Sequence, residues 1–155
     1  MKKLLTTALL SGACILAHGA QTNTYFAIGA AAVNGGSIAP GVAVYAPNFE
    51  VGLDATGLSY NSESSWGTTL WGGLRRPIKN NLNLTMGASV TGIFNSSMAN
   101  AYSVSPYIGL DIIHLSGLPV LLGGWINPIS WNKVQSDSNA TWVFGSGGLK
   151  LAYLF

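Results

Sequence analysis

Few residues of this chain can take part in acid–base or nucleophilic chemistry. The most suggestive group is His114-Leu115-Ser116, which sets an imidazole two residues from a hydroxyl. A histidine can activate a serine as a nucleophile when a third group orients the imidazole. No glutamate follows Glu63, and the adjoining Gly117-Leu118-Pro119 is typical of a turn. We therefore favour a structural or interfacial role for His114, and the chain is not expected to be an enzyme.

The sequence also gives little support for a bound metal or cofactor. Metal sites need clusters of His, Cys or carboxylates, and here Glu50, Asp54 and Asp111 are the chief candidates. A structural network of charges explains these three at least as well. No P-loop or dinucleotide glycine pattern is present. The nearest run, Gly145-Ser146-Gly147-Gly148, lies in the last expected strand, where it eases packing or bending. The sequence predicts neither a metal site nor a cofactor.

The scarcity of charge is the main feature of the composition. Of 155 residues, seven are Lys or Arg and five are Asp or Glu, which is 8% of the chain, whereas ordinary soluble domains carry about 25%. The formal net charge of +2 does not favour nucleic-acid binding. A hydrophobic content of 48% excludes disorder. The length allows one domain.

The N-terminal residues 1–19 have the pattern of a secretory signal peptide. Met1-Lys2-Lys3 is basic, Leu4 to Ala17 is apolar, and Ala17-His18-Gly19 offers small residues for signal-peptidase cleavage. A retained membrane helix is the alternative, but the apolar run is shorter than the ~20 residues of a span. Residues 20–155 then form the mature domain.

Cys14 lies inside this signal segment. A lipoprotein signal carries Leu three residues before the lipidated cysteine, and here that position is Ser11. We therefore treat Cys14 as an ordinary residue of the signal. The mature chain then has no cysteine, no disulfide and no thiol chemistry.

The pattern of the remaining residues predicts β-strands. Beyond residue 20 no apolar stretch approaches the ~18 residues of a helical span. An exported chain of this composition is then either a soluble all-β protein or a closed transmembrane barrel, since lipid permits only helices and closed barrels. Seven clusters of turn-forming residues predict eight strands, and an even number suits two termini on one side of a membrane. The clusters are Asn34-Gly35-Gly36, Pro47-Asn48, Asn61 to Ser65, Pro77 to Asn81, Asn95-Ser96-Ser97, Ser116 to Pro119 and Gln135 to Asn139.

Apolar and polar residues alternate within the expected strands. Between residues 82 and 91, even-numbered residues are apolar or small and odd-numbered residues are polar or small, and segments 50–55, 108–112 and 149–155 alternate similarly. The apolar face points inward in a soluble barrel and outward in a membrane barrel. Alternation alone does not decide between them. Residues 24–33 are nearly all apolar or small, which leaves the facing of the first strand open.

Aromatic residues favour the membrane barrel. Most of them lie near the ends of the expected strands, where amphipathic rings form two belts at the lipid headgroups. A soluble core would instead need them in the middle of strands. The belt beside the outer loops comprises Tyr60, Trp66, Phe94, Tyr102, Trp131 and Trp142, and the opposite belt comprises Tyr25, Phe26, Tyr45, Phe49, Tyr153 and Phe155.

The C-terminus carries a more specific resemblance. Leu149, Leu151, Tyr153 and the terminal Phe155 share one face, which resembles the signal that bacterial outer-membrane barrels present to their assembly machinery. The chain from Gln21 to Phe155 resembles the eight-stranded OmpA/OmpX-like class. The resemblance implies an all-β, eight-stranded antiparallel up-and-down transmembrane β-barrel in the bacterial outer membrane. It also implies a monomer whose partners are outer-membrane lipids, lipopolysaccharide and the barrel assembly machinery.

Side chains about fill the lumen of an eight-stranded barrel, so no wide pore is expected. Buried charges need partners. With the barrel's strand directions, Glu50 and Arg75 lie near one rim on neighbouring strands, and the sequence predicts that they pair. It also predicts a cluster of Lys150 with Asp111 and Asp54. The expected interior charges are thus Glu50, Asp54, Arg75, Asp111 and Lys150.

These inferences predict a small outer-membrane barrel with a structural or surface-interaction role. Its outer loops are short and mostly uncharged, which suits hairpin closure. One alternative is a lipid A-modifying enzyme, because His114-Leu115-Ser116 locally resembles the His-x-Ser pair of lipid A deacylases. Those enzymes act near the outer leaflet, whereas His114 is expected at the periplasmic end. The second alternative is a soluble secreted β-barrel that binds a hydrophobic ligand.

Overall fold

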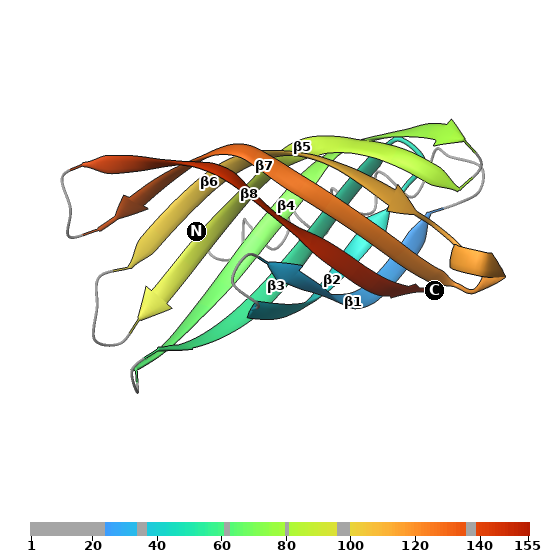
Figure 1. Ribbon diagram of the computed structural model, residues 1–155. Helices are drawn as coiled ribbons and strands as arrows, with labels where there is room; N and C mark the ends of the chain where they lie inside the picture. Colours follow the sequence, from blue (N-terminus) through green and yellow to red (C-terminus); the bar gives the residue numbers. More distant parts are fainter. Residues whose placement is uncertain (1–23, 34–36, 61–62, 80, 96–99, 136–138) are drawn as a thin grey trace, which may run out of the picture.

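Eight antiparallel strands close into one barrel in the residues that the structure describes (Figure 1). The structure is a computed structural model, and it describes residues 24–33, 37–60, 63–79, 81–95, 100–135 and 139–155. Each strand pairs with its neighbours in the sequence, and the first pairs with the last. The strands are β1 (Tyr25–Val33), β2 (Ser37–Tyr45), β3 (Phe49–Tyr60), β4 (Glu63–Lys79), β5 (Leu82–Asn95), β6 (Ala101–Ile112), β7 (Val120–Val134) and β8 (Ala140–Leu154).

The prediction of an all-β, eight-stranded antiparallel barrel is therefore confirmed. The predicted signal peptide over residues 1–19 lies outside the described residues. Within the described part of the chain, no helix has the length and apolar character needed to cross a membrane.

The connections follow the predicted turns, with corrections at three of them. The turn predicted from Asn61 to Ser65 is wrong at its end, because Glu63 to Ser65 already belong to β4, and Asn95, predicted to be in a turn, is the last residue of β5. Pro47 and Asn48 separate β2 from β3, and a short 3-10 helix, η1 (Leu115–Gly117), precedes β7. The turn predicted from Pro77 to Asn81 is wrong at its start, because β4 continues through Pro77 to Lys79. The β4–β5 register shifts between these two residues, and an irregularity of this kind accommodates a proline that has no N–H to donate. The predicted turn residues at 34–36, 61–62, 80, 96–97 and 136–138 lie outside the described residues.

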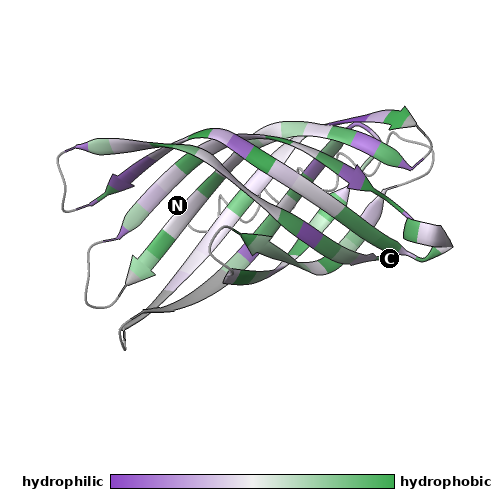
Figure 2. Ribbon diagram, viewed as in Figure 1, coloured by the Kyte–Doolittle hydropathy of each residue, from purple (hydrophilic) through white to green (hydrophobic). Residues whose placement is uncertain are grey.

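Apolar side chains cover the outside of the barrel, and small or polar side chains face its lumen. On β6 the alternation is strict: Tyr107 and Asp111 are buried, whereas Ile108 and Leu110 are exposed. Figure 2 shows the same alternation of hydropathy along neighbouring strands. The expected apolar faces of segments 82–90 and 149–155 both point outward in this arrangement.

The facing of β1, which the sequence left open, follows the same rule. Phe26 and Ile28 are 65% and 59% exposed, while Ala27 and Ala31 are buried. The register aligns Ala31 with Lys150 of β8 and with Ala39 of β2. The lumen wall formed by β1 and β2 is therefore built mainly from small residues, with the larger Tyr45 at one end.

An irregularity near the middle of β8 reverses which residues face the lumen. The β7–β8 ladder passes from the Asn127–Ser146 pair to the Ile129–Phe144 pair, and Gly145 between them has a φ of 72°. A backbone in this left-handed region favours glycine. On one side of Gly145 the lumen is lined by Ser146 and Lys150, and on the other side by Val143.

Candidate functional site

The lumen of the barrel contains a cavity with a volume of about 540 Å³. We call the barrel end with the β2–β3, β4–β5 and β6–β7 connections the closed end, and the opposite end the open end. The C-terminus lies at the closed end (Figure 1). Strand faces of β1 and β2 contribute Ala and Gly to the cavity wall, whereas β4 to β8 contribute hydroxyl, amide and indole groups.

Arg75 organises the closed end of the lumen. Its Nη2 donates to Asp111 Oδ1 at 2.9 Å, and its Nη1 donates to the carbonyl oxygen of Ala46 at 3.0 Å. Its Nε lies 3.8 Å from Glu50 Oε2. The predicted contact between Glu50 and Arg75 is present, but the shorter ion pair of Arg75 is with Asp111. This side chain is only 1% exposed, so the guanidinium is fully enclosed by its partners.

Lys150 enters the same cluster from β8. Its Nζ donates to Glu50 Oε2 at 3.2 Å and lies 4.0 Å from Asp111 Oδ2. The phenol of Tyr107 donates to the other Glu50 oxygen at 2.7 Å, and Asn83 Nδ2 donates to Asp111 Oδ1 at 2.9 Å. Two acids thus face two bases, and hydrogen bonds from neutral donors add to both carboxylates. Such pairing is what makes buried charges tolerable.

Tyr45 lies between the two cations. The Arg75 guanidinium carbon is 5.3 Å from the Tyr45 ring centroid and the Lys150 ammonium is 5.0 Å from it. Both distances are within the range of cation–π attraction. The sequence assigned Tyr45 to an aromatic belt, and this prediction is wrong: the side chain is buried inside the lumen.

Asp54 departs from the prediction. Its Oδ2 accepts a hydrogen bond from Trp71 Nε1 at 2.8 Å, and no ion pair joins it to Lys150 among the described residues. The reason is geometric, since Lys150 points toward Glu50 and packs over the Trp71 ring at 4.9 Å. The indole is therefore set between Asp54 and the cluster. Gly52 of β3 leaves room for it, because a Cβ there would meet the Trp71 ring.

Apolar residues complete the closed end. Leu121 is 0% exposed, and Leu154 and Ala27 are buried beside it in the cluster that contains Tyr45. Together with the four charged residues they fill this end of the barrel.

The open half of the lumen is lined by hydroxyl groups, which the sequence pattern did not mark as a site. Ser105 donates to Ser130 at 2.8 Å, and the hydroxyls of Thr69 and Thr91 lie 2.9 Å apart. Asn127 Nδ2 donates to Ser146 at 3.0 Å. The alternation already indicated such a lining, since Ser89 and Thr91 oppose the apolar face of their segment. What it did not indicate was that short side chains here leave a cavity.

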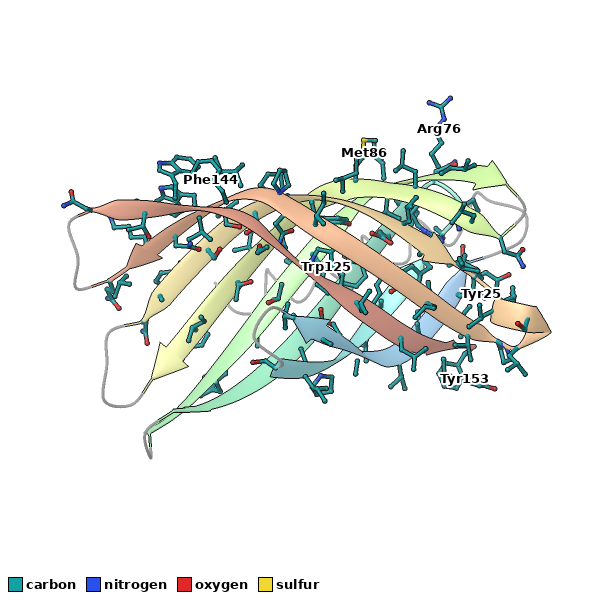
Figure 3. The ribbon with its side chains drawn as sticks, viewed as in Figure 1. Tyr25, Arg76, Met86, Trp125, Phe144 and Tyr153 are labelled. Atoms are coloured by element: carbon teal, nitrogen blue, oxygen red, sulfur yellow. The ribbon has the colours of Figure 1, made fainter. Side chains whose placement is uncertain are left out.

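His114 lies at the closed end, outside the lumen cluster. Its Nε2 is 3.0 Å from the hydroxyl of Tyr25, and the two rings meet edge to face with centroids 5.1 Å apart. Ser116 is exposed, and its φ of 53° belongs to the tight bend around η1. Tyr25, which the sequence assigned to an aromatic belt and which is labelled in Figure 3, is therefore the partner of His114.

The aromatic residues predicted beside the outer loops lie toward the open end. Trp66 is exposed and stacks on Phe94 with ring centroids 4.5 Å apart. Trp142 and Tyr102 are also exposed, and Trp131 is half-buried and pairs in register with Trp142. The side chain of Tyr60 lies outside the described part of the structure.

The predicted C-terminal face points outward. Leu149, Leu151, Tyr153 and Phe155 are all exposed, and the rings of the last two meet at 5.0 Å. Tyr153 projects away from the barrel wall in Figure 3, as do Met86 and Phe144 on other strands. These residues belong to one continuous apolar exterior.

No group of three or more His, Cys, Asp or Glu side chains suited to a metal occurs in the described residues. The sequence matches no protein-family model, and no curated protein is significantly similar to it.

Proposed function

We propose that this protein is a small barrel of the bacterial outer membrane, with a structural or surface-interaction role and no wide pore. The observation that carries the proposal is the apolar exterior. Large side chains including Ile28, Val42, Leu74, Met86 and Leu151 are exposed on the wall, whereas Glu50, Arg75 and Asp111 are buried in the lumen. In water such an exterior is an extensive aggregation surface, but in lipid it is the ordinary outer face of a barrel.

The closed end argues against a diffusion pore. Arg75, Glu50 and Asp111 are joined by ion pairs, and Tyr45 and Leu121 pack beside them. Moving these side chains aside would separate buried charges from their partners, which is energetically unfavourable. A structural barrel or one that binds partners at its outer surface suits this interior better.

The partners in this proposal are outer-membrane lipids, lipopolysaccharide and the barrel assembly machinery, and the protein is a monomer. The outward face of Leu149, Leu151, Tyr153 and Phe155 supports contacts with lipid and with assembly factors. The resemblance to the OmpA/OmpX-like class belongs to the same proposal, and the eight-stranded closed barrel agrees with it.

The two alternatives are less well supported. A soluble barrel that binds a hydrophobic ligand would direct its large apolar side chains inward, and here they face outward. A lipid A deacylase would need His114 to activate a serine. The imidazole instead contacts the hydroxyl of Tyr25. The carboxylates of the nearby lumen pair with Arg75 and Lys150 rather than with His114.

Extraction and gel migration test the proposal. We expect the protein to leave the cell envelope only with detergent, and to migrate differently in SDS gels before and after heating, because membrane barrels stay folded in SDS until heated. Release by salt or alkaline buffer alone would contradict membrane insertion. Comparison of lipid A mass spectra with and without the protein separates the deacylase alternative, which alone predicts a lost acyl chain.

A further inference from the structure

The barrel wall is incomplete beside the short β1–β2 hairpin. β1 and β2 have nine residues each, whereas β7 and β8 have 15. The β1–β8 ladder ends at the Val33–Gly148 pair, yet β8 continues to Ala140. Residues 140–146 of β8 therefore pair only with β7 within the described ladders.

The other side of the hairpin separates from its neighbour too. The β2–β3 ladder ends at the Gly41–Asp54 pair, although β3 continues to Tyr60. Pro40 comes next on β2 and has no N–H to donate to a ladder. In Figure 1 the β1–β2 hairpin accordingly stops well short of the far ends of β7 and β8.

A recess occupies the place where β1 ends against β8. It has a volume of about 580 Å³ and is lined by Ala32 and Val33 of β1, residues 125–128 of β7 and residues 145–149 of β8. Its lining includes Trp125, which also lines the lumen, together with Ile126 and Leu149, which are exposed on the exterior. We call this recess the side opening.

The side opening adjoins the lumen cavity. Val33, Trp125, Asn127 and Ser146 line both. The indole of Trp125 lies over Gly148, where a Cβ would be 2.6 Å from the ring. A side chain at position 148 would therefore collide with the indole.

The chemistry of the side opening suits an uncharged chain. None of its lining residues is charged, and the charged residues of the lumen are gathered at the closed end. One polar atom stands out: Asn127 Oδ1 is buried and makes no hydrogen bond among the described residues. Buried polar atoms are normally hydrogen-bonded, so this oxygen is available to a donor on a ligand.

We infer that the side opening admits one acyl chain of a membrane lipid into the lumen, with Asn127 Oδ1 accepting a hydrogen bond from the lipid's hydroxyl or amide group. This inference rests on the proposed membrane location, which puts Ile126 and Leu149 in contact with lipid. Irregular or unpaired strand edges are not stable against bare hydrocarbon unless they border protein or a filled cavity. A chain that enters at the side can extend only toward the open half, because the closed end is filled.

Fluorescence quenching tests this inference. Trp66, Trp131 and Trp142 are replaced by Phe, which leaves Trp71 and Trp125 as reporters in the lumen. The protein is inserted into vesicles of phosphatidylcholine, either unmodified or brominated on its acyl chains. We expect bromine to quench the reporters, and Val33→Phe, which narrows the passage between the two cavities, to reduce that quenching.

Val104→Phe is the matched control, because Val104 of β6 is exposed on the outer face. It makes the same substitution without touching the passage, and quenching should match the parent. Equal quenching in the two variants would overturn the inference. Should the triple Phe background not fold, the comparison is made with all five tryptophans present and with Val90→Phe as the control, because Val90 is exposed and pairs in register with Leu70 and Val104 rather than with a tryptophan.

Two further measurements distinguish other outcomes. Flotation of the vesicles and heat-dependent gel migration report insertion, so a protein that floats but shows no effect of Val33→Phe overturns the side opening and leaves the proposed membrane location standing. A crosslinked dimer present in Val104→Phe and absent in Val33→Phe would assign the opening to a second copy of the chain and likewise overturn the inference.

Discussion

The two ends of the lumen accommodate polar side chains in different ways. The closed end is packed with oppositely charged side chains that pair with one another, and Arg75, Glu50 and Asp111 are buried there. The open end is lined by neutral groups around free space, among them the hydroxyls of Ser105 and Ser130, the amide of Asn127 and the apolar side chain of Val143. Buried charges in a barrel interior are stable only where oppositely charged and hydrogen-bonding partners surround them. Where space remains, short neutral groups line it at little cost.

This comparison predicts that substitutions at the closed end destabilise the fold far more than those at the open end. The largest effect is expected for Arg75→Met. It leaves Glu50 and Asp111 buried without the guanidinium, which should lower the free energy of unfolding by about 3–5 kcal/mol. Urea unfolding of the refolded protein, followed by gel migration, measures the change.

Arg76→Met is the control for this variant. Arg76 is the next residue on β4, is exposed and points away from the barrel (Figure 3). A surface change of this kind should stay within about 0.5 kcal/mol. Similar losses in both variants would mean that general loss of positive charge, and not the buried network, determines stability.

Lys150→Met should have the next largest effect. It removes the 3.2 Å hydrogen bond to Glu50 Oε2, and hydrogen bonds to charged groups contribute about 1.5–3 kcal/mol. The effect should be smaller than for Arg75 because the Lys150 side chain is partly exposed and makes fewer bonds. Unchanged or raised thermal stability would contradict the predicted role of Lys150.

Glu50 and Lys150 should also be energetically coupled. In Glu50→Gln/Lys150→Met the loss is expected to fall short of the sum of the single losses by about 1 kcal/mol, since contacting residues in one network are not additive. A strictly additive double mutant would indicate that the 3.2 Å contact contributes nothing of its own.

Trp71→Phe probes the boundary between the two ends. It deletes the donor to Asp54 Oδ2, and an unsatisfied carboxylate should cost about 1–2 kcal/mol. Asp54→Asn should cost less, because the amide oxygen still accepts from the indole. Should Asp54→Asn prove as damaging as Arg75→Met, Asp54 would have to be counted in the ion-pair network after all.

The smallest effect is expected at the open end. Ser130→Ala removes the acceptor of the 2.8 Å bond from Ser105, and a neutral hydrogen bond contributes about 0.5–1.5 kcal/mol. Water can reach the freed hydroxyl through the open half, so the loss should lie at the lower end of this range. A loss as large as that for Lys150→Met would remove the distinction between the two ends.

Much of the barrel and its interior was predictable because strands impose a period of two. The charge of Glu50, Asp111 and Lys150 together with that period directed them inward, and the structure brings them together with Arg75. Tyr45 was misassigned because position near a strand end was taken as evidence of a belt. Which face a ring occupies depends on strand phase, and Tyr45 shares the inner face of β2 with Ala39 and Ala43.

Asp54 could not be assigned correctly from the sequence. Its inward facing follows from alternation, but its partner depends on how far each side chain reaches across the lumen. Trp71 reaches Asp54 from the neighbouring strand because Gly52 leaves space for its ring. Lys150, approaching from the opposite wall, meets Glu50 first.

Local pattern by itself determined the all-β class, the number of strands and the inward facing of the charges, because each depends on turn-forming residues and on alternation along a single strand. Only the tertiary structure decided which charges pair, where the lumen is filled and where the wall is open. Those features depend on the stagger between strands, as in the Val33–Gly148 and Gly41–Asp54 pairs that end two ladders. Stagger arises from closing the sheet into a barrel, and no single strand contains it.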